Sequence, residues 1–225
     1  MAHADVTKAE PMRAYMKSAM PFLGIAAPRL DRLAAEAVKA HPCADPAELA
    51  GTMLALWREA RYREERYAAL ELPRLGRVHA RLVNLELLPV AQEMITTGAW
   101  WDLVDDISGS LLARLLERHP IEVKAALRRW AMSDDLWLRR AAMLAQRGVK
   151  ADSFDAELFY ETILPSIGNG RFAGEFFIRK GIGWALRERA YQAPDEVRAF
   201  CAEYAQQLAP LTVREALRRI DRAHR

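Results

Sequence analysis

Two adjacent tryptophans and three carboxylates lie close together near the middle of the chain. Trp100 and Trp101 are followed within about one helical turn by Asp102, Asp105 and Asp106. Because residues four positions apart lie on one face of a helix, the indole of Trp101 and the carboxylate of Asp105 are expected to point the same way. An aromatic face beside an anionic oxygen suits the binding of a cation better than it suits a hydrophobic core. The spacing therefore predicts a site that stabilises positive charge.

Other catalytic chemistries lack their characteristic residues in this sequence. The histidines are scattered, with no cysteine or carboxylate at metal-ligand spacing: they are His3, His41, His79, His119 and His224. The sequence also lacks a phosphate-binding glycine loop, a nucleophile elbow and a convincing serine or cysteine triad. We therefore expect neither a metal nor a cofactor.

The composition is typical of one soluble domain covering residues 1–225. Hydrophobic residues make up 52% of the chain and charged residues 28%, which excludes a disordered protein. The net charge of +3 and the pI near 9.0 permit a polyanionic partner without requiring one. Cys43 and Cys201 are far apart and are expected to be reduced thiols. Because no segment approaches the roughly 20 apolar residues of a membrane span, we expect no membrane partner and a cytoplasmic location.

The spacing of apolar residues indicates helices throughout. Apolar residues recur at three- and four-residue intervals, and convincing period-two alternation is absent. Proline and glycine divide the chain into roughly a dozen helices of about 10–18 residues. Candidate N-terminal caps agree with these divisions: Asp45 before Pro46, Ser133, and Thr212 with Glu215 as a capping box. The sequence therefore predicts an all-α protein.

A short motif recurs along the chain, in which an arginine is followed two positions later by a small residue. It occurs at Arg66/Ala68, Arg139/Ala141, Arg179/Gly181 and Arg214/Ala216, with spacings of 73, 40 and 35 residues. A period of about 35–47 residues built from helix pairs is typical of HEAT-like or armadillo-like repeats. We therefore expect a right-handed superhelical solenoid of HEAT-like helical repeats with a concave basic groove. A generic helical bundle is the alternative.

In a solenoid, the second helix of each pair lines the concave surface, so a stripe of basic residues is expected there. This stripe would contain Arg66, Arg139, Arg140, Arg179, Lys180, Arg187, Arg218 and Arg219. Such a surface suits the phosphate backbone of a nucleic acid duplex. For any single arginine, pairing with a neighbouring carboxylate is the alternative.

Trp184 follows two glycines within a helical pattern. Gly181 and Gly183 each cost a helix roughly 1 kcal/mol relative to alanine. Close approach of another helix, or access of a ligand to the backbone, would explain both. The sequence leaves open whether Trp184 belongs to the core or to a site.

An ordered set of segments resembles the HEAT-like-repeat DNA glycosylases of the AlkD type, which repair alkylated DNA in bacteria. The segments run nearly from end to end: Pro11–Lys17, Phe22–Ile25, Trp100–Asp105, Trp137–Ala142, Glu175–Glu188 and Leu208–Ala216. No single motif is decisive, but the set in this order is specific.

The resemblance implies a monomeric enzyme that removes N3- and N7-alkylated purines from double-stranded DNA, associated with the nucleoid in the cytoplasm. It implies that Asp105, Trp101 and Trp184 surround the sugar of the lesion, that Arg140 approaches the DNA backbone nearby, and that Tyr15 contacts the lesion region. Arg139, Lys180, Arg179 and Arg187 would add DNA-binding charge in the groove. Asp106 adds a carboxylate beside Asp105 and is expected to raise the pKa of that neighbour.

Two other functions remain open at this point. A non-catalytic DNA-binding relative would keep the basic groove and lose the chemistry. A protein-binding helical scaffold would show no salt-dependent binding to DNA.

Overall fold

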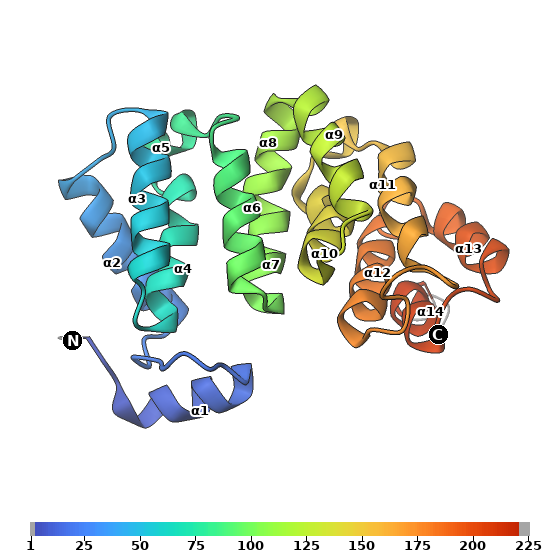
Figure 1. The fold of residues 1–225 in the computed structure, drawn as a ribbon, viewed down its shortest axis with the longest axis horizontal. Coiled ribbons are helices and arrows are strands. Elements are labelled where there is room, and N and C mark those ends of the chain that lie inside the picture. Colours follow the sequence, from blue (N-terminus) through green and yellow to red (C-terminus); the bar gives the residue numbers. More distant parts are fainter. Residues whose placement is uncertain (1–2, 221–225) are drawn as a thin grey trace. The chain divides into compact units, whose positions relative to one another are not determined.

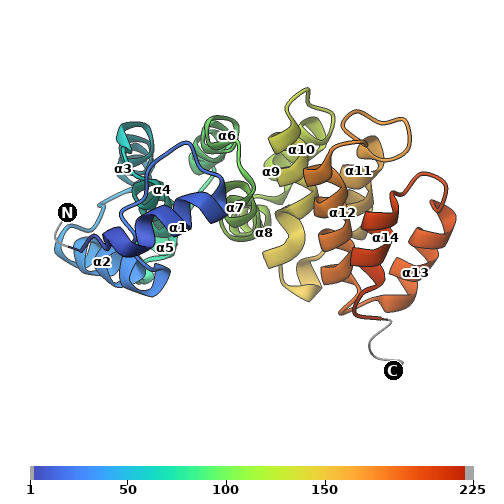
Figure 2. The ribbon, with the colours of Figure 1, turned by 90° about the horizontal axis from the view of Figure 1, so that it is seen from below.

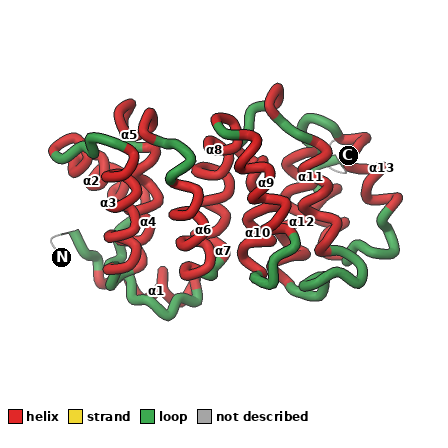
Figure 3. Tube along the Cα trace, turned by 45° about the horizontal axis from the view of Figure 1, so that its top comes forward, coloured by secondary structure: helices red, strands yellow, loops and turns green. Residues whose placement is uncertain are grey.

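A computed structural model of the protein describes residues 3–220, and every regular element in this range is a helix or a helical turn (Figures 1 and 3). The prediction of an all-α protein is confirmed. The chain divides into two compact units, Met1–Val90 and Ala91–Arg225, and the boundary between them falls inside α6 (Leu87–Gly98).

The first unit contains five complete α-helices among its described residues. They are α1 (Val6–Met16), α2 (Ala27–Ala40), α3 (Pro46–Glu59), α4 (Arg63–Glu71) and α5 (Gly76–Leu82). The carboxylate of Asp45 accepts a hydrogen bond from the Glu48 amide, as expected for the cap of α3. The buried carboxylate of Glu64 accepts hydrogen bonds from the amides of Leu23, Gly24 and Ile25, at 2.8–3.1 Å. Glu64 thereby fixes the segment between α1 and α2 against α4.

The second unit alternates two sets of helices along the chain. Its elements are α7 (Trp101–Asp106), a π-helical turn (Ile107–Leu112), α8 (Ala113–Arg118), α9 (Pro120–Ala131), α10 (Leu136–Leu144), α11 (Ala156–Ile163), α12 (Phe176–Arg189), α13 (Pro194–Glu203) and α14 (Pro210–Leu217). Short 3₁₀ segments join some of them, including Ala145–Gly148 directly after α10. α7, the π-helical turn and α8 follow one another without a break.

One layer of the second unit is formed by α7, α10, α12 and α14. α10 contacts both α7 and α12, and α12 contacts α14. Figure 2 shows α12 between α10 and α14. α9 packs against α10 and α11, so α9 and α11 lie behind this layer. Helices of the front layer and helices behind it therefore alternate along the chain, as in proteins built from stacked helical pairs. The repeated motif predicts this arrangement.

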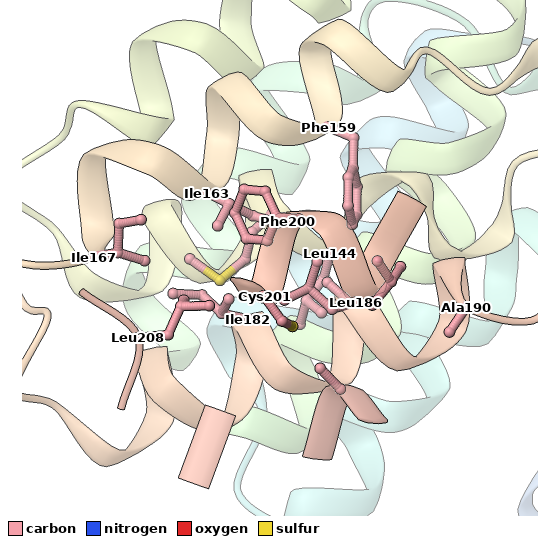
Figure 4. Packing of buried hydrophobic residues seen from close by; sticks show 14 of the residues in the cluster. Leu144, Phe159, Ile163, Ile167, Ile182, Leu186, Ala190, Phe200, Cys201 and Leu208 are labelled. Atoms are coloured by element: carbon pink, nitrogen blue, oxygen red, sulfur yellow. The ribbon is translucent and has the colours of Figure 1, made fainter. Parts of the chain in front are cut away.

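Apolar side chains from α10 to α14 form the core that holds this layer in place. Leu144, Ile163, Ile182 and Leu186 are at most 2% exposed, and Phe200 packs with them (Figure 4). Because α12 contributes one face to this core, its opposite face is available for a site.

The repeated arginine has a structural role that its sequence pattern does not reveal. Arg139 Nε donates to the carbonyl oxygen of Ser133 at 2.6 Å, and Arg179 Nε donates to that of Ala173 at 2.9 Å. In both repeats the acceptor lies six residues earlier, in the loop before the helix. At these two of its four occurrences, the repeated arginine therefore ties its own helix to the preceding loop.

Two predicted helix caps are wrong. The cap of α10 is Asp135, whose carboxylate accepts from the two amides that follow it by two and three residues. Ser133 lies further upstream and accepts from the Asp135 amide. α14 begins at Pro210, so Thr212 lies inside the helix, where its hydroxyl donates to the Arg179 carbonyl at 3.0 Å. Thr212 and Glu215 therefore join α14 to α12 and do not form a capping box.

Gly183 allows the close approach of α12 and α14. A Cβ atom at this position would lie 2.7 Å from Glu215 Cβ and 2.9 Å from the Thr212 carbonyl oxygen. Close helix approach, one of the two explanations expected from the sequence, therefore accounts for this glycine.

Gly183→Ala is expected to lower the free energy of unfolding by about 1–3 kcal/mol, because α14 must move away from α12 to make room for the methyl group. Chemical denaturation followed by circular dichroism measures this. Gly51→Ala on α3 is the matched control. A Cβ atom there meets nothing within 4 Å, so alanine should leave stability equal or higher. Equal behaviour of the two variants would contradict the close-approach explanation.

Candidate active site

A pocket of about 350 Å³ opens on the α7–α10–α12 layer of the second unit. Its lining comprises Trp101, Asp105, Arg140, Phe176, Phe177, Lys180, Trp184 and Arg187. We call this the site pocket. Trp101 and Asp105 come from α7, Arg140 from α10, and the others from α12. On α12, Lys180, Trp184 and Arg187 share one face because they are spaced by four and three residues.

Asp105 and Arg140 form a buried, two-fold hydrogen-bonded ion pair at the base of this lining. Arg140 Nε donates to Asp105 Oδ1 at 2.7 Å, and Nη2 donates to Oδ2 at 2.8 Å. The third nitrogen, Nη1, donates to the carbonyl oxygen of Phe177 on α12. The paired geometry fixes the plane of the carboxylate. Arg140 therefore joins the three helices that carry the site.

The space for Arg140 depends on Gly181. A Cβ atom at Gly181 would lie 2.9 Å from Arg140 Nη1 and 3.2 Å from the sulfur of Met143. Gly181 is therefore explained by the Arg140 side chain, which packs directly against the backbone of α12 where a side chain would stand.

Burial raises the pKa of Asp105, and the carboxylate of Asp102 adds to the rise. The hydrogen bonds and charge of Arg140 oppose it, as does the charge of Arg147. The neighbouring carboxylate that contributes is thus Asp102, while the sequence pointed to Asp106. Arg140 and Arg147 therefore favour the ionised form of the Asp105 carboxyl against its burial.

The indoles of Trp101 and Trp184 are both half-buried and both face the site pocket. Trp184 Nε1 donates to Glu188 Oε1 at 3.0 Å, which fixes the ring from its own helix. The structure thereby places Trp184 in the lining of the site pocket and not in the buried core.

An aromatic wall borders the pocket at the start of α12. The ring of Phe177 lies 5.3 Å from that of Trp100 and 5.1 Å from that of Trp137, while Phe176 is 58% exposed. The sequence did not single out either phenylalanine as a site residue. The signal that could have found Phe177 is its position two residues before Arg179, which matches that of Trp137 before Arg139.

Two cations on the pocket face of α12 share one carboxylate. Lys180 Nζ lies 2.7 Å from Glu215 Oε1, and Arg187 Nη1 lies 2.8 Å from Oε2. Both cations retain surface at the pocket, whereas Glu215 is 7% exposed. Glu215 therefore holds the two cations at a set separation along α12.

Glu215→Gln is expected to reduce stability at pH 7 and to lose that effect in acid. The hydrogen bond from Lys180, aided by the charge of Arg187, lowers the pKa of Glu215. A lowered folded-state pKa contributes stability above the ordinary value of 4.5, and this stability is lost as pH falls through the folded-state pKa. Unfolding curves of parent and variant between pH 3 and pH 7 check this. Glu122→Gln, an exposed change on α9, is the control; a gap between parent and Glu215→Gln that does not narrow as the pH falls would contradict the expectation.

Two other residues expected at the DNA surface do not line the site pocket, and a third, whose expected contact with the lesion region stays a prediction, belongs to the first unit. Arg139 is 3% exposed and donates to the carbonyl oxygens of Ser133 and Pro165, so its expected place in the groove is wrong. Arg179 is half-buried and tied to its loop, and it does not line the site pocket. Tyr15 belongs to α1 of the first unit and is 78% exposed.

Within residues 3–220, no group of three or more histidine, cysteine, aspartate or glutamate residues is arranged to hold a metal ion. None of the described helices is both long enough and apolar enough to cross a membrane.

The fold and the pocket define a helical-repeat protein with a charged, indole-lined site. The chain belongs to the DNA alkylation repair enzyme family, whose sequence profile matches residues 1–220. Among solved structures, it is similar to a predicted DNA alkylation repair enzyme from Enterococcus faecalis, with 26% sequence identity and a TM-score of 0.79. The similarity covers 96% of this chain and 95% of that chain. No curated protein matches the chain significantly.

Proposed function

We propose that residues 1–225 act as one monomeric DNA glycosylase, which hydrolyses the N-glycosidic bond of cationic N3- or N7-alkylated purines in duplex DNA. The observation that supports this most is the site pocket, where a carboxylate held by Arg140 lies with two indoles and two further cations. Membership of a DNA alkylation repair family supports the same substrate class.

The chemistry follows from the charge of the substrate. A purine alkylated at N3 or N7 already carries a positive charge, so the bond to its sugar breaks with the electron pair leaving on the base. No general acid is needed to protonate the base. The sugar becomes an oxocarbenium-like cation, and the reaction is completed when water adds to C1′ and loses a proton.

Each pocket residue has a role in this reaction. The carboxylate of Asp105 stabilises the cationic sugar and accepts a hydrogen bond from the attacking water. The indole faces of Trp101 and Trp184 add cation–π attraction. Lys180 and Arg187 contact phosphates of the DNA backbone, where neutralisation of charge dominates affinity. The protein works on DNA in the cytoplasm, at the nucleoid of a bacterium.

The direct test is to incubate the purified protein with methylated duplex DNA and to identify the released bases by mass spectrometry. The expected products are 7-methylguanine and 3-methyladenine. Duplex binding that weakens with salt, without release of any base, would instead indicate a non-catalytic DNA-binding protein. Absence of salt-dependent binding to DNA would favour a protein-binding scaffold.

A further inference from the structure

We propose that Arg147 is a positioning residue of the site pocket, which supports the indole of Trp184 from behind and ties it to the backbone of Asp105. Arg147 belongs to the 3₁₀ segment after α10. It is not part of the pocket lining. This inference rests on the proposed glycosylase function, but its structural part can be tested separately.

A single guanidinium connects two residues of the site. Its central carbon lies 3.5 Å from the centroid of the Trp184 ring, which is a stacking distance. Its Nη1 donates to the carbonyl oxygen of Asp105 at 3.5 Å. Trp184 and Asp105 lie on α12 and α7, so Arg147 links the two helices at the level of the site.

The linings of two cavities indicate that Arg147 stacks on the face of Trp184 that is turned away from the site pocket. Arg147 lines a separate cavity of about 140 Å³, together with Glu188 and Arg189, whereas Trp184 lines the site pocket. The indole therefore has a guanidinium on one side and the pocket on the other. A planar cation on the rear face fixes the ring's tilt without occupying the space that a sugar would need.

Two glycines allow the 3₁₀ segment that carries Arg147 to lie close to the π-helical turn after α7. A Cβ atom at Gly109, in the π-helical turn after α7, would lie 3.5 Å from three atoms of the guanidinium. A Cβ atom at Gly148 would overlap the carbonyl oxygen of Gly109. The 3₁₀ segment and the π-helical turn are thus in backbone contact, and π-helical turns often occur at functional sites.

The charge of Arg147 also acts on Asp105. The charged groups that act on Arg147 are Asp105, Glu188, Arg140 and Asp106. Burial lowers the pKa of Arg147, while Asp105 and Glu188 favour its cationic form. In return, the charge of Arg147 favours ionised Asp105, alongside Arg140 and against Asp102.

Two substitutions separate shape from charge. Arg147→Met removes both the charge and the flat stacking surface, whereas Arg147→Lys removes the flat stacking surface and keeps the charge. For Arg147→Met, we expect single-turnover release of 7-methylguanine to fall about tenfold, because the indole is misplaced. The acidic limb of the pH–rate profile is the range in which the rate falls as Asp105 becomes protonated. We expect this limb to move to higher pH in Arg147→Met, because the charge that favours ionised Asp105 is lost. For Arg147→Lys, the rate should fall while the acidic limb stays near its parent position.

Arg189→Met is the matched control, because the guanidinium of Arg189 stacks on Phe154 at 4.3 Å and lines the same small cavity. It removes a comparable aromatic contact without touching Trp184 or Asp105. Its rate and acidic limb should match those of the parent. If Arg147→Met and Arg189→Met lose the same amount of rate and neither shifts the acidic limb, Arg147 contributes only general packing. That result would overturn the proposal.

A nuclear magnetic resonance measurement tests the support of Trp184 without any substrate. The indole Nε1–H signal of Trp184 is identified by its loss in Trp184→Phe. We expect this signal to shift and broaden in Arg147→Met and to stay unchanged in Arg189→Met. An unchanged signal in Arg147→Met overturns the proposal. If the parent protein releases no base, the glycosylase function fails, and this signal alone decides whether Arg147 positions the indole.

Discussion

Asp105→Asn is expected to slow the release of 7-methylguanine from methylated duplex DNA by about a hundredfold to a thousandfold, the usual cost of losing one preorganised electrostatic contact. The substituted amide keeps the size of the carboxylate and loses its negative charge. The sugar cation then has no anionic partner in the site pocket. Single-turnover kinetics with excess protein measure the rate of the chemical step.

Affinity for the duplex should change little in this variant, because the backbone contacts proposed for Lys180 and Arg187 do not involve Asp105. Fluorescence anisotropy with a labelled duplex checks this at several salt concentrations. Asp106→Asn is the matched control on the same helix, since Asp106 does not line the site pocket. A rate for Asp105→Asn equal to that of the parent would show that the carboxylate has no part in the reaction.

The same carboxylate determines the expected pH dependence of the parent protein. Protonation of Asp105 removes the charge that the reaction needs. Because burial raises the pKa of Asp105, the rate should begin to fall at a higher pH than for an ordinary aspartate. No loss of rate is expected on the alkaline side from deprotonation of a general acid, since the leaving base is already charged.

Arg140→Met is expected to have the largest effect on stability, lowering the free energy of unfolding by about 3–5 kcal/mol. Removing the guanidinium leaves the Asp105 carboxylate buried without its two hydrogen bonds, and it removes the bond to the Phe177 carbonyl on α12. Urea denaturation followed by tryptophan fluorescence is a suitable measurement. Five of the six tryptophans lie beyond residue 90, so the signal reports mainly on the second unit.

The double variant Asp105→Leu/Arg140→Met is the informative control. It replaces both members of the buried pair with apolar groups, which is often neutral or stabilising compared with leaving one charge alone. We expect it to recover part of the stability lost in Arg140→Met and to remain inactive. If the double variant is less stable than Arg140→Met, the unpaired carboxylate is not the cause of the loss.

Sequence periodicity predicted well those parts of the site that depend on one helix. The four-residue spacing of Trp101 and Asp105 predicts that they share a face, and both line the site pocket on α7. The repeated motif likewise falls on three of the four helices in the layer of the second unit, α10, α12 and α14, but not on α7. These features follow from local geometry, which a single sequence encodes directly.

Sequence periodicity did not predict which side chains form contacts between helices. The motif places Arg139 and Arg179 on the correct helices, but the acceptors of their guanidinium groups are loop carbonyls that no pattern reveals. Arg147 follows α10 in a short 3₁₀ segment, and its ring partner Trp184 lies 37 positions later on another helix. Only the packing of α7, α10 and α12 brings these groups together.

The central claim is that a carboxylate and two indoles act on a base that already carries positive charge. Two matched duplexes, one with a single 7-methylguanine and one with a neutral hypoxanthine at the same position, test it most directly. Single-turnover rates should show release of 7-methylguanine, with release of hypoxanthine close to the background without protein. Comparable release of both bases would contradict the claim, because a neutral base leaves readily only if the site protonates it or stabilises it as an anion.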